Sequence, residues 1–455
     1  MRIVVLDDDP TGSQTVHSCH LLLSWDISTL REGIRNQTDL LFILANTRVL
    51  TENKLIERIK IIANNLKEAL RLEGIKYDDL LFISRGDSTL RGHGFLEPKL
   101  ISNELGPFKA VFHIPAFFEG GRKTINGIHF LNDIPVHKTI FSQDPRFGFS
   151  TSDLTEWLLY KSSGEILPKN ILRITIDMLN SSKINLFDNK KNQLQDFLCN
   201  LKQQHHVIVD ANKKEDLEIL VNNIRSLKSK KNFLFRSAAS FINAISGVDS
   251  KIISSKEIYY LKAKDSLGNC KPGIVIVGSY IKLSENQLEL LLKQKSWKGL
   301  ELSVSKFESI FFGTSSKMLL NEMKSELISQ GREILLKNYN LVLYTSREII
   351  SLTTELKQVD FEIALAKFMA VISSELSCFA GFFISKGGTT TNTFLVDGLK
   401  AKSVYLHGQI MPGLSLVYAK TEKNSFPVVT FPGNLGNDEM LLQACQIMSG
   451  IKTTN

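Results

Sequence analysis

Short apolar runs rich in β-branched residues alternate with longer helix-like stretches along this chain of 455 residues. The alternation predicts mostly parallel sheets flanked by helices, because two parallel strands need a long crossover connection, usually a helix. The expected strands are Ile3–Leu6, Leu40–Leu44, Leu80–Ile83, Ala110–Ile114, Val207–Val209, Ile274–Val277, Leu341–Tyr344, Phe382–Ile384, Val404–Leu406 and Val428–Phe431.

Three stretches carry the pattern of a helix. In Asn53–Glu73, apolar residues recur at spacings of three and four behind Thr51, the expected N-cap. Ser284–Lys293 opens with Ser-Glu-Asn-Gln, which matches a capping box, and Phe361–Leu376 repeats apolar residues at helical spacing. The first of these helices is expected to cover one face of a sheet.

The length indicates two domains, because one hydrophobic core rarely serves a chain of 51.2 kDa. The polar stretch Leu261–Gly273 contains glycine and proline, and a strand pattern follows it at once. We therefore expect an α/β protein with domains at 1–262 and 273–455, each built on a mostly parallel sheet flanked by helices.

The amino-acid composition of the chain excludes several classes of function. With 43% hydrophobic and 22% charged residues, the chain can bury a core and lacks the polarity of a disordered protein. Its net charge of +8 comes from scattered basic residues, which suits small anions better than nucleic acid. No apolar run approaches membrane-spanning length. The isolated cysteines, together with the absence of a signal-peptide pattern, predict a cytoplasmic protein without membrane or nucleic-acid contacts; they are Cys19, Cys199, Cys270, Cys378 and Cys445.

Polar residues follow the expected strands, at the edge where ligands bind in open α/β sheets. In the first half the segment 7–12, Asp-Asp-Asp-Pro-Thr-Gly, places three carboxylates in a tight turn. Adjacent like charges raise one another's pKa unless a cation or a donor lies nearby. The segment therefore favours a base for a substrate hydroxyl or a magnesium ligand over the alternative, a solvated turn that caps a helix.

A second segment, 84–93, contains an acid, hydroxyls and two arginines together with two glycines. Arginine binds carboxylates in a bidentate manner, and hydroxyls suit sugar hydroxyls. The alternative is an Asp87–Arg91 ion pair on a helix surface, which would contribute little. A third basic segment, 115–127, contains Arg122 and could also be an exposed loop. The histidines are predicted to be core or supporting residues rather than metal ligands, because their spacing matches no ligand pair; they are His93, His113, His129 and His137.

In the second half, three strand ends carry glycine turns: Gly278-Ser279, Gly387-Gly388 and Gly433–Gly436. Glycine lets backbone amides approach a phosphate closely. The usual P-loop, dinucleotide and protein-kinase signatures are absent from the sequence. These turns predict a nucleotide site of another type.

Taken in order, these motifs resemble those of the four-carbon acid sugar kinases over nearly the whole chain. They are Asp8-Asp9-Pro10-Thr11-Gly12, Asp87-Ser88-Thr89-Leu90-Arg91-Gly92, Gly121-Arg122, Gly278-Ser279, Gly387-Gly388-Thr389-Thr390 and Gly433-Asn434-Leu435-Gly436. The central hexapeptide is the most specific of them. The chain departs from the family pattern at Ser13-Gln14-Thr15, Arg236-Ser237-Ala238-Ala239 and Thr389, which bears on substrate identity more than on fold.

The resemblance implies an acid-sugar domain followed by an ATP domain, with the active site in the cleft between them. The implied activity is transfer of the ATP γ-phosphoryl group to a terminal hydroxyl of a tetronate or 3-oxo-tetronate. Carried over by motif, the residues that hold substrate are Asp8, Asp9, Thr11, Ser88, Thr89, Arg91 and Arg122. Those that hold nucleotide are Ser279, Gly387, Gly388, Thr389, Gly433, Asn434, Leu435 and Gly436.

Phosphoryl transfer requires in-line placement, charge neutralisation and a base for the incoming hydroxyl. We expect Arg91 and Arg122 to clamp the substrate carboxylate, Asp8 or Asp87 to accept the proton, and Mg²⁺ to bridge the phosphates of ATP. Two alternatives remain: a haloacid-dehalogenase-like phosphatase that uses Asp7 and Asp9, and a non-catalytic protein that binds sugar acids. A homodimer is also left open.

Overall fold

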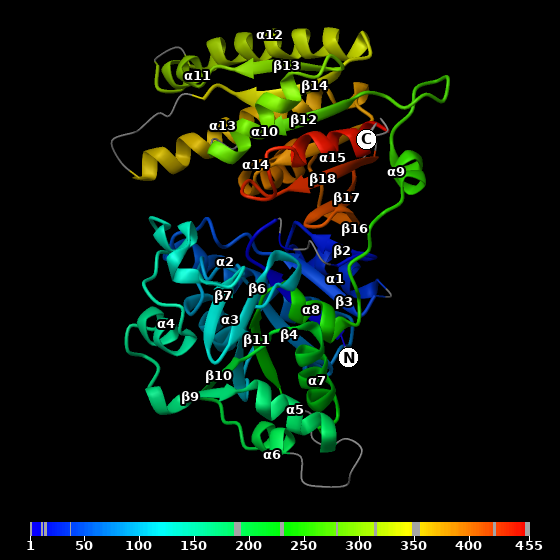
Figure 1. Ribbon diagram of the computed structural model, residues 1–455. Coiled ribbons are helices and arrows are strands. Elements are labelled where there is room, and N and C mark those ends of the chain that lie inside the picture. Colours follow the sequence, from blue (N-terminus) through cyan, green and yellow to red (C-terminus); the bar gives the residue numbers. More distant parts are fainter. Residues whose placement is uncertain are drawn as a thin grey trace. The chain divides into compact units, whose positions relative to one another are not determined.

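The computed structural model describes residues 2–10, 12, 16–36, 38–185, 193–227, 232–278, 281–313, 316–347, 355–421 and 425–450. Two of the predicted ligand-binding residues, Thr11 and Ser279, lie outside the described residues. The chain divides into two compact units, Met1–Ser250 and Lys251–Asn455. Each unit has its own sheet and its own core (Figure 1).

The sheet of the first unit is parallel, in the order β2-β3-β1-β4-β11-β5-β10-β9. Segments distant in sequence therefore lie side by side: β11, green in Figure 1, runs between the bluer strands β4 and β5. The strands are β1 (Arg2–Asp7), β2 (Cys19–Leu22), β3 (Leu40–Leu44), β4 (Leu80–Arg85), β5 (Ala110–Ile114), β9 (Ile171–Ile174), β10 (His205–Val209) and β11 (Phe233–Ser237).

Helices cover both faces of this sheet. On one face α1 (Ile27–Arg35), α2 (Glu52–Leu72) and α3 (Leu96–Leu105) bury their apolar sides against β1, β3 and β4. On the other face Phe241 of α8 (Ala239–Ser246) stacks on Phe235 of β11, with ring centroids 4.7 Å apart. The remaining elements are α4 (Leu154–Lys161), α5 (Ile176–Asn185), α6 (Gln193–Cys199), α7 (Lys214–Arg225) and an antiparallel sheet of β6 (Arg122–Ile125), β7 (Ile128–Leu131) and β8 (Ile134–Pro135).

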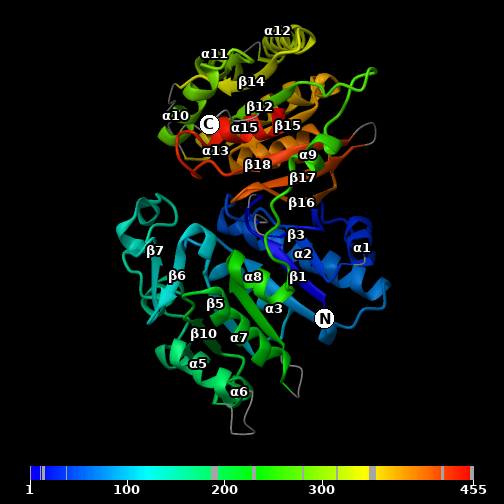
Figure 2. The same cartoon turned by 45° about the vertical axis from the view of Figure 1, so that its right-hand side comes forward.

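The sheet of the second unit has the order β13-β14-β12-β15-β18-β17-β16. It is parallel as far as β18 and antiparallel from there on, and the antiparallel strands are orange in Figure 2. The strands are β12 (Gly273–Val277), β13 (Trp297–Leu302), β14 (Asn340–Thr345), β15 (Phe382–Lys386), β16 (Ser403–Met411), β17 (Leu414–Lys420) and β18 (Ser425–Phe431). The helices are α9 (Ser255–Leu261), α10 (Lys282–Leu292), α11 (Val304–Phe311), α12 (Ser316–Leu336), α13 (Glu355–Glu375), α14 (Gly388–Thr393) and α15 (Met440–Ser449).

The α/β class and the mostly parallel sheets are confirmed, and every expected strand falls within an observed one. Sequence analysis did not predict the other strands, which are β2, β6, β7, β8, β9, β11, β13 and β17. In β13, for example, exposed residues alternate with buried ones, so the strand has no continuous apolar run.

One capping prediction is confirmed and the other is wrong. Thr51 is the N-cap of α2, as predicted, although its side chain makes no capping hydrogen bond. The α10 helix begins before Ser284, with Ile281 as its N-cap, and Ser284 Oγ instead donates to the Gly433 carbonyl at 3.0 Å. The hydroxyl that resembled a cap therefore ties α10 to one of the glycine turns.

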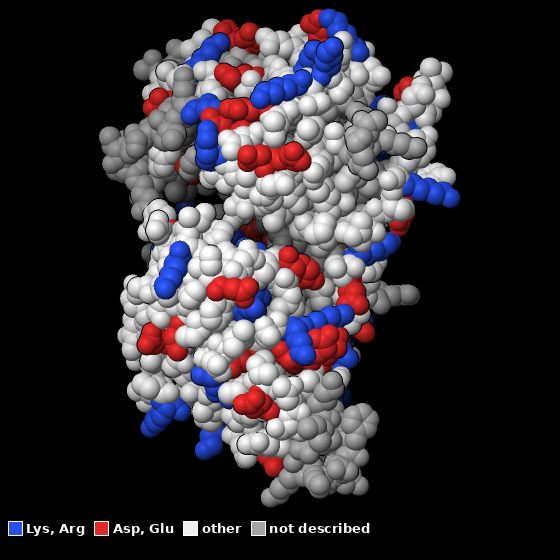
Figure 3. Space-filling view, in the orientation of Figure 1, with Lys and Arg blue, Asp and Glu red and all other residues white. Residues whose placement is uncertain are grey.

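Within the described ranges, none of the helices combines the length and apolar character needed to cross a membrane. On the face drawn in Figure 3, basic and acidic side chains are interspersed, and neither kind forms a continuous stripe.

Candidate active site

The three aspartates lie where β1 ends, in the middle of the first unit's sheet. The Gly12 amide donates to the Asp9 carbonyl at 2.9 Å and closes the turn. A β-carbon built on Gly12 would lie 2.1 Å from Asp7 Oδ1, so only glycine fits there. The turn therefore folds its backbone directly over the Asp7 carboxyl.

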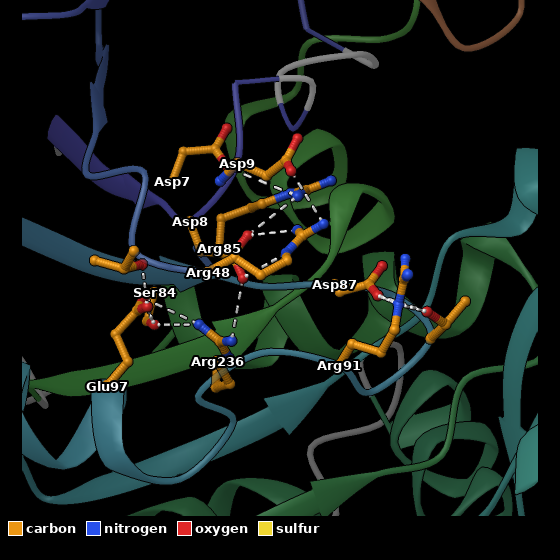
Figure 4. Close-up of polar contacts among 12 residues, drawn as sticks. Asp7, Asp8, Asp9, Arg48, Ser84, Arg85, Asp87, Arg91, Glu97 and Arg236 are labelled. Carbon is orange, nitrogen blue, oxygen red and sulfur yellow. Dashed lines mark hydrogen bonds and ion pairs between the residues drawn. The ribbon is translucent and has the colours of Figure 1, made fainter. Parts of the chain in front are cut away.

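Asp8 is surrounded by three guanidinium groups from three other segments (Figure 4). Arg48, which follows β3, places Nη2 2.7 Å from Asp8 Oδ1. Arg85 at the end of β4 lies 3.5 Å from the same oxygen, and Arg236 of β11 lies 3.6 Å from Oδ2. Because β3, β1, β4 and β11 are neighbours in the sheet, these distant residues meet at its carboxyl edge.

A buried layer beneath this cluster holds Arg236 in place. Arg236 Nη1 donates to Ser84 Oγ at 2.8 Å and to Glu97 Oε1 at 3.1 Å. Glu97, on α3, also accepts from Thr47 Oγ1 at 2.6 Å. A β-carbon on Gly86 would lie 2.3 Å from the Arg236 guanidinium carbon. Because glycine has no β-carbon, the Arg236 guanidinium can lie against the backbone at this position.

Asp7 differs from its neighbours because part of its carboxyl has no partner. Burial raises the pKa of Asp7 to about 7; the charge of Arg85 opposes this rise, and the charges of Asp8 and Asp9 add to it. Oδ1 lies 3.6 Å from Arg85 Nη1, whereas Oδ2 has no hydrogen-bond partner in the described part of the chain. Asp7 is thus a buried carboxyl that changes protonation near neutral pH.

The segment 86–95 is a loop, and it comes close to Asp8. A β-carbon on Gly92, whose φ is +87°, would lie 3.2 Å from Asp8 Oδ2. Leu90 also has a positive φ of 65°, which is strained for a branched side chain. Such strain persists only where the surroundings determine the conformation, and it is common at functional sites.

Asp87 forms the second charged centre. Its Oδ2 accepts from Arg91 Nε at 2.7 Å and from Thr89 Oγ1 at 2.5 Å. Burial alone would raise the pKa of Asp87, but the charges of Arg91 and Arg48 outweigh burial and hold that pKa below its usual value. The Asp87–Arg91 pair is therefore a loop contact inside the site, not a contact on a helix surface.

His129 supports this loop from β7. Burial lowers the pKa of His129 to about 4, so the imidazole is neutral at physiological pH. Its Nε2 lies 2.8 Å from the Ser88 carbonyl, which can only accept, and its Nδ1 lies 3.0 Å from Thr124 Oγ1. His129 thus donates to the backbone of the Asp87 loop.

Arg122 also belongs to this second centre. Burial lowers the pKa of Arg122, and the charges of Asp87 and Arg91 act on it in opposite directions. Its Nη1 donates to the Gly120 carbonyl at 2.5 Å, whereas its buried Nε has no partner in the described ranges.

In the second unit, two of the predicted glycine turns lie side by side. Gly387, with a φ of +111°, donates its amide to the Phe431 carbonyl at 2.8 Å, and α14 begins directly after it. Lys386 places Nζ 3.2 Å from the Gly433 carbonyl and 3.3 Å from the Pro432 carbonyl. Burial lowers the pKa of Lys386 to about 7. This lysine joins the end of β15 to the turn after β18.

Hydroxyl groups line the sheet beneath α14. Ser385, Thr430 and Ser415 face one another across β15, β18 and β17, and Thr391 Oγ1 on α14 lies 3.1 Å from Ser385 Oγ. The buried hydroxyls of Thr430 and Ser415 have no hydrogen-bond partner in the residues that the structure describes. Unpaired buried groups and the free first amides of a helix suit an oxygen-rich anion such as a nucleotide phosphate.

Two domain families match the chain. Residues 3–245 match the sugar-binding N-terminal domain, and residues 274–441 match the nucleotide-binding C-terminal domain. The first match alone spans more than half of the chain, and the two domains together are the architecture of one family. The chain belongs to the four-carbon acid sugar kinase family.

Solved structures share the fold over almost their whole length. Protein HI1011 of Haemophilus influenzae, of the DUF1537 family, has a TM-score of 0.59 at 16% identity, covering 98% of this chain and 99% of its own. A protein from Salmonella typhimurium LT2, provisionally named a tRNA synthase, has a TM-score of 0.64 at 14% identity, covering 97% and 98%. These similarities concern the fold alone. No curated protein matches the chain.

Within this family member, the structure brings the predicted substrate residues Asp8, Asp9, Asp87, Thr89, Arg91 and Arg122 to one part of the first unit. His129 donates a hydrogen bond to the backbone carbonyl of Ser88. In the second unit, Thr389, Asn434 and Gly436 are exposed, so their backbone can meet a ligand from solvent.

Sequence analysis assigned no role to much of the supporting charge. Arg48 and Arg85 each follow a predicted strand, and Arg85 lies in the segment 84–93, but neither was given a place in the site. Arg236 lies in β11, which carried no clear strand pattern, and Glu97 lies on α3, so only the fold identifies these two. Lys386 stood beside a predicted turn, but its burial was not foreseeable from sequence.

The described residues offer no ready set of ligands for Mg²⁺. Nowhere in these ranges do three or more His, Cys, Asp or Glu side chains gather closely enough to hold a metal ion. Asp8 and Asp9 are both paired with Arg48. We therefore derive no step that passes through a protein-bound metal.

Proposed function

We propose that this protein is an ATP-dependent kinase that phosphorylates a hydroxyl of a four-carbon acid sugar of the tetronate or 3-oxo-tetronate class. The observation that carries the proposal is the pairing in one chain of a sugar-binding domain, which has a buried carboxylate–guanidinium site, with a nucleotide-binding domain. Arginines suit the acid group of such a substrate, and carboxylates suit its hydroxyls.

Arg91 and Arg122 would hold the substrate carboxylate in this proposal. The buried Nε of Arg122 has no partner among the residues that the structure describes, and this supports the assignment, because a buried guanidinium N–H without a partner costs free energy unless a ligand satisfies it. Thr89 and Ser88 lie in the same loop and would face the sugar hydroxyls. Asp87 would orient Arg91 rather than act as the base, because its lowered pKa makes it a weak proton acceptor.

The sequence named two candidates, Asp8 and Asp87, for the group that accepts the hydroxyl proton, and Asp7 is a third. Asp8 is paired with three arginines, so its role in this proposal is to position those arginines. Asp7 has a pKa of about 7 and an oxygen without a partner in the described ranges. We therefore assign proton acceptance to Asp7, in preference to Asp8 or Asp87, because catalytic bases work best with a pKa near the operating pH.

For the nucleotide, Gly388, Thr389 and the turn Gly433–Gly436 would supply backbone amides to the phosphates. ATP, when bound, supplies the phosphoryl group. Lys386 and Ser284 both contact the Gly433 carbonyl and would keep the second turn in shape. Mg²⁺ as a companion of ATP stays a prediction, as does the homodimer.

The test is a coupled assay of ADP formation with ATP, Mg²⁺ and a panel of tetronates that includes threonate, erythronate and their 3-oxo forms. We expect ADP release with at least one of them, and identification of the product as a sugar-acid phosphate by mass spectrometry. Absence of turnover with every member of the panel, while ATP still binds, would reject the kinase.

Two other outcomes would support the alternatives. Release of phosphate from sugar phosphates without ATP, with a phosphoryl group trapped on Asp7, would indicate the phosphatase. Binding of sugar acids without any turnover would indicate the non-catalytic protein. The phosphatase finds less support, because it leaves the nucleotide-binding domain without a role.

A further inference from the structure

The 140–149 segment, which lies between β8 and α4 in the sequence, contacts the Asp87 loop of the first unit. Its Phe141 ring lies over the guanidinium of Arg91, with 4.9 Å between the guanidinium carbon and the ring centroid. Its Asp144 places Oδ2 3.9 Å from Arg91 Nη1. Neither the sequence motifs nor the proposed function includes this segment, although it lies against the arginine that is proposed to bind the acid group.

Contacts away from Arg91 anchor the 140–149 segment. Lys161 Nζ on α4 donates to the Gly148 carbonyl at 3.0 Å. The Phe147 ring meets His93 edge to face, with ring centroids 5.1 Å apart. A ligand can therefore bind Arg91 without releasing the segment from the rest of the unit.

The Asp144 carboxylate is held in one orientation. Its Oδ1 accepts from the amides of Arg146 and Phe147 at 3.0 and 2.9 Å. These two bonds leave Oδ2 on the side of Arg91. Because 3.9 Å is too long for a hydrogen bond, Asp144 Oδ2 and Arg91 Nη1 do not satisfy each other. Both atoms can therefore form hydrogen bonds with a ligand.

A 2-hydroxy acid offers the two groups that this arrangement can bind. Its carboxylate would accept from Arg91, as in the proposed function. The hydroxyl on the neighbouring carbon lies beside one carboxylate oxygen, so it would come close to Asp144 Oδ2 and donate to it. An ionised carboxylate can only accept hydrogen bonds. Asp144 would therefore bind a hydroxyl at this carbon, but not a keto oxygen or a methylene group.

We propose that Asp144 is a specificity-determining residue, which accepts a hydrogen bond from the hydroxyl on carbon 2 of the acid sugar. The inference rests on the proposed function and narrows its substrate class to 2-hydroxy acids. Tetronates and 3-oxo-tetronates carry this hydroxyl, whereas 2-oxo and 2-deoxy acids do not. A site built to bind a hydroxyl discriminates against ligands that lack it, because its own polar group is then left without a partner.

Calorimetric titration without ATP tests the inference. Threonate and erythronate are each compared with the 3,4-dihydroxybutanoate enantiomer of the same configuration at carbon 3, which lacks only the hydroxyl on carbon 2. We expect the wild type to bind at least one tetronate about tenfold more tightly than its 2-deoxy partner. A preference of this size is expected because hydrogen bonds to charged groups are stronger than those between neutral groups.

Two substitutions remove the Asp144 oxygen that faces Arg91. Asp144→Ser keeps an oxygen that can accept from the amides of Arg146 and Phe147, whereas Asp144→Ala keeps none. In both variants the ratio of the two Kd values should fall to about one. In Asp144→Ser the Kd for the 2-deoxy acid should stay within about twofold of the wild-type value, whereas loss of a merely structural residue would weaken the binding of both acids equally.

Glu165→Gln is the matched control. Glu165 also pairs with a cation, that of Lys99, but its side chain is 52% exposed and belongs to no part of the proposed site, so the wild-type ratio should persist. Circular dichroism and thermal melting establish that each variant is folded. A wild-type ratio near one, no binding of either acid to the wild type, or the wild-type ratio in folded Asp144→Ser would each overturn the inference.

The assay of ADP formation separates this inference from the kinase proposal. Preferential binding of a tetronate that Asp144→Ser abolishes, without ADP release from any sugar acid, would support the role of Asp144 and reject the kinase. ADP release with a tetronate, at a wild-type Kd ratio near one, would support the kinase and reject the role of Asp144.

Discussion

Arg48 Nη2 lies 2.7 Å from Asp8 Oδ1, and Arg48 Nη1 lies 3.2 Å from Asp9 Oδ2. One arginine thus joins two of the three aspartates, while Arg85 and Arg236 approach Asp8 from other strands. Asp8 is therefore the anion around which the cationic site of the first unit is arranged.

Replacing Asp8 by asparagine should abolish this arrangement. We expect Asp8→Asn to lower kcat/KM for the acid sugar at least about 100-fold, and to cost roughly 3–5 kcal/mol in free energy of unfolding, because buried cations lose their counter-ion. Steady-state kinetics and urea unfolding measure the two effects, and calorimetry should show unchanged ATP affinity. Glu73→Gln is the control: Glu73 also pairs with two arginines, but at the surface, and activity should persist.

The protonation of Asp7 should govern the acid side of the pH–rate profile. With its pKa at about 7, Asp7 is protonated below neutrality, so kcat should rise with pH through that value. Asp7→Asn should lose turnover while keeping ATP binding. A wild-type profile that is flat between pH 6 and pH 8, or full activity in Asp7→Asn, would remove Asp7 as the proton acceptor.

Asp7 should also make the free energy of unfolding depend on pH. Its folded-state pKa is above its unfolded value, so the folded state binds the extra proton, and this stabilisation is lost as pH rises through about 7. Between pH 5 and pH 7 the wild type should lose about 2 kcal/mol of unfolding free energy from this group, which Asp7→Asn should not lose. Urea unfolding of both proteins at several pH values provides the comparison, and parallel curves would contradict the prediction.

Gly92 and Gly74 form a matched pair of left-handed glycines. Their φ values are +87° and +67°, so alanine at either position should cost about 1 kcal/mol in backbone strain. A β-carbon on Gly92 would approach Asp8 Oδ2 to 3.2 Å, whereas one on Gly74 would meet nothing within 4 Å. Gly92→Ala should therefore lose activity and Gly74→Ala should keep it. Similar kcat/KM values in the two variants would show that Gly92 acts on stability alone.

Lys386 should affect nucleotide binding selectively. Lys386→Met removes the contacts to the Pro432 and Gly433 carbonyls, so we expect the KM for ATP to rise about tenfold with little change in the KM for the acid sugar. Lys262→Met is the control, because Lys262 is also buried and donates to a carbonyl, that of Met448, at 3.0 Å. Equal effects of both variants on the KM for ATP would assign Lys386 a general structural role.

The sequence by itself determined the α/β class, the positions of the longer strands and the family. For the strands, this holds for the ten that were predicted and not for β13 and β17, which are as long as many of those. The predicted properties follow from local periodicity and from the order of short motifs, which need no knowledge of distant contacts. It also identified the residues that follow strands, since the carboxyl ends of parallel strands always meet at one edge of a sheet.

Only the tertiary structure decided which charges pair. Arg236 meets Ser84, 152 positions away, because β11 inserts between β4 and β5, and Lys386 meets Gly433 because β15 and β18 are neighbours. The same packing gives the adjacent aspartates different surroundings: Asp8 is paired with three guanidinium groups, and Asp7 is buried with a raised pKa. Burial and long-range ion pairing depend on which strands become neighbours, and no local pattern in the chain specifies that order.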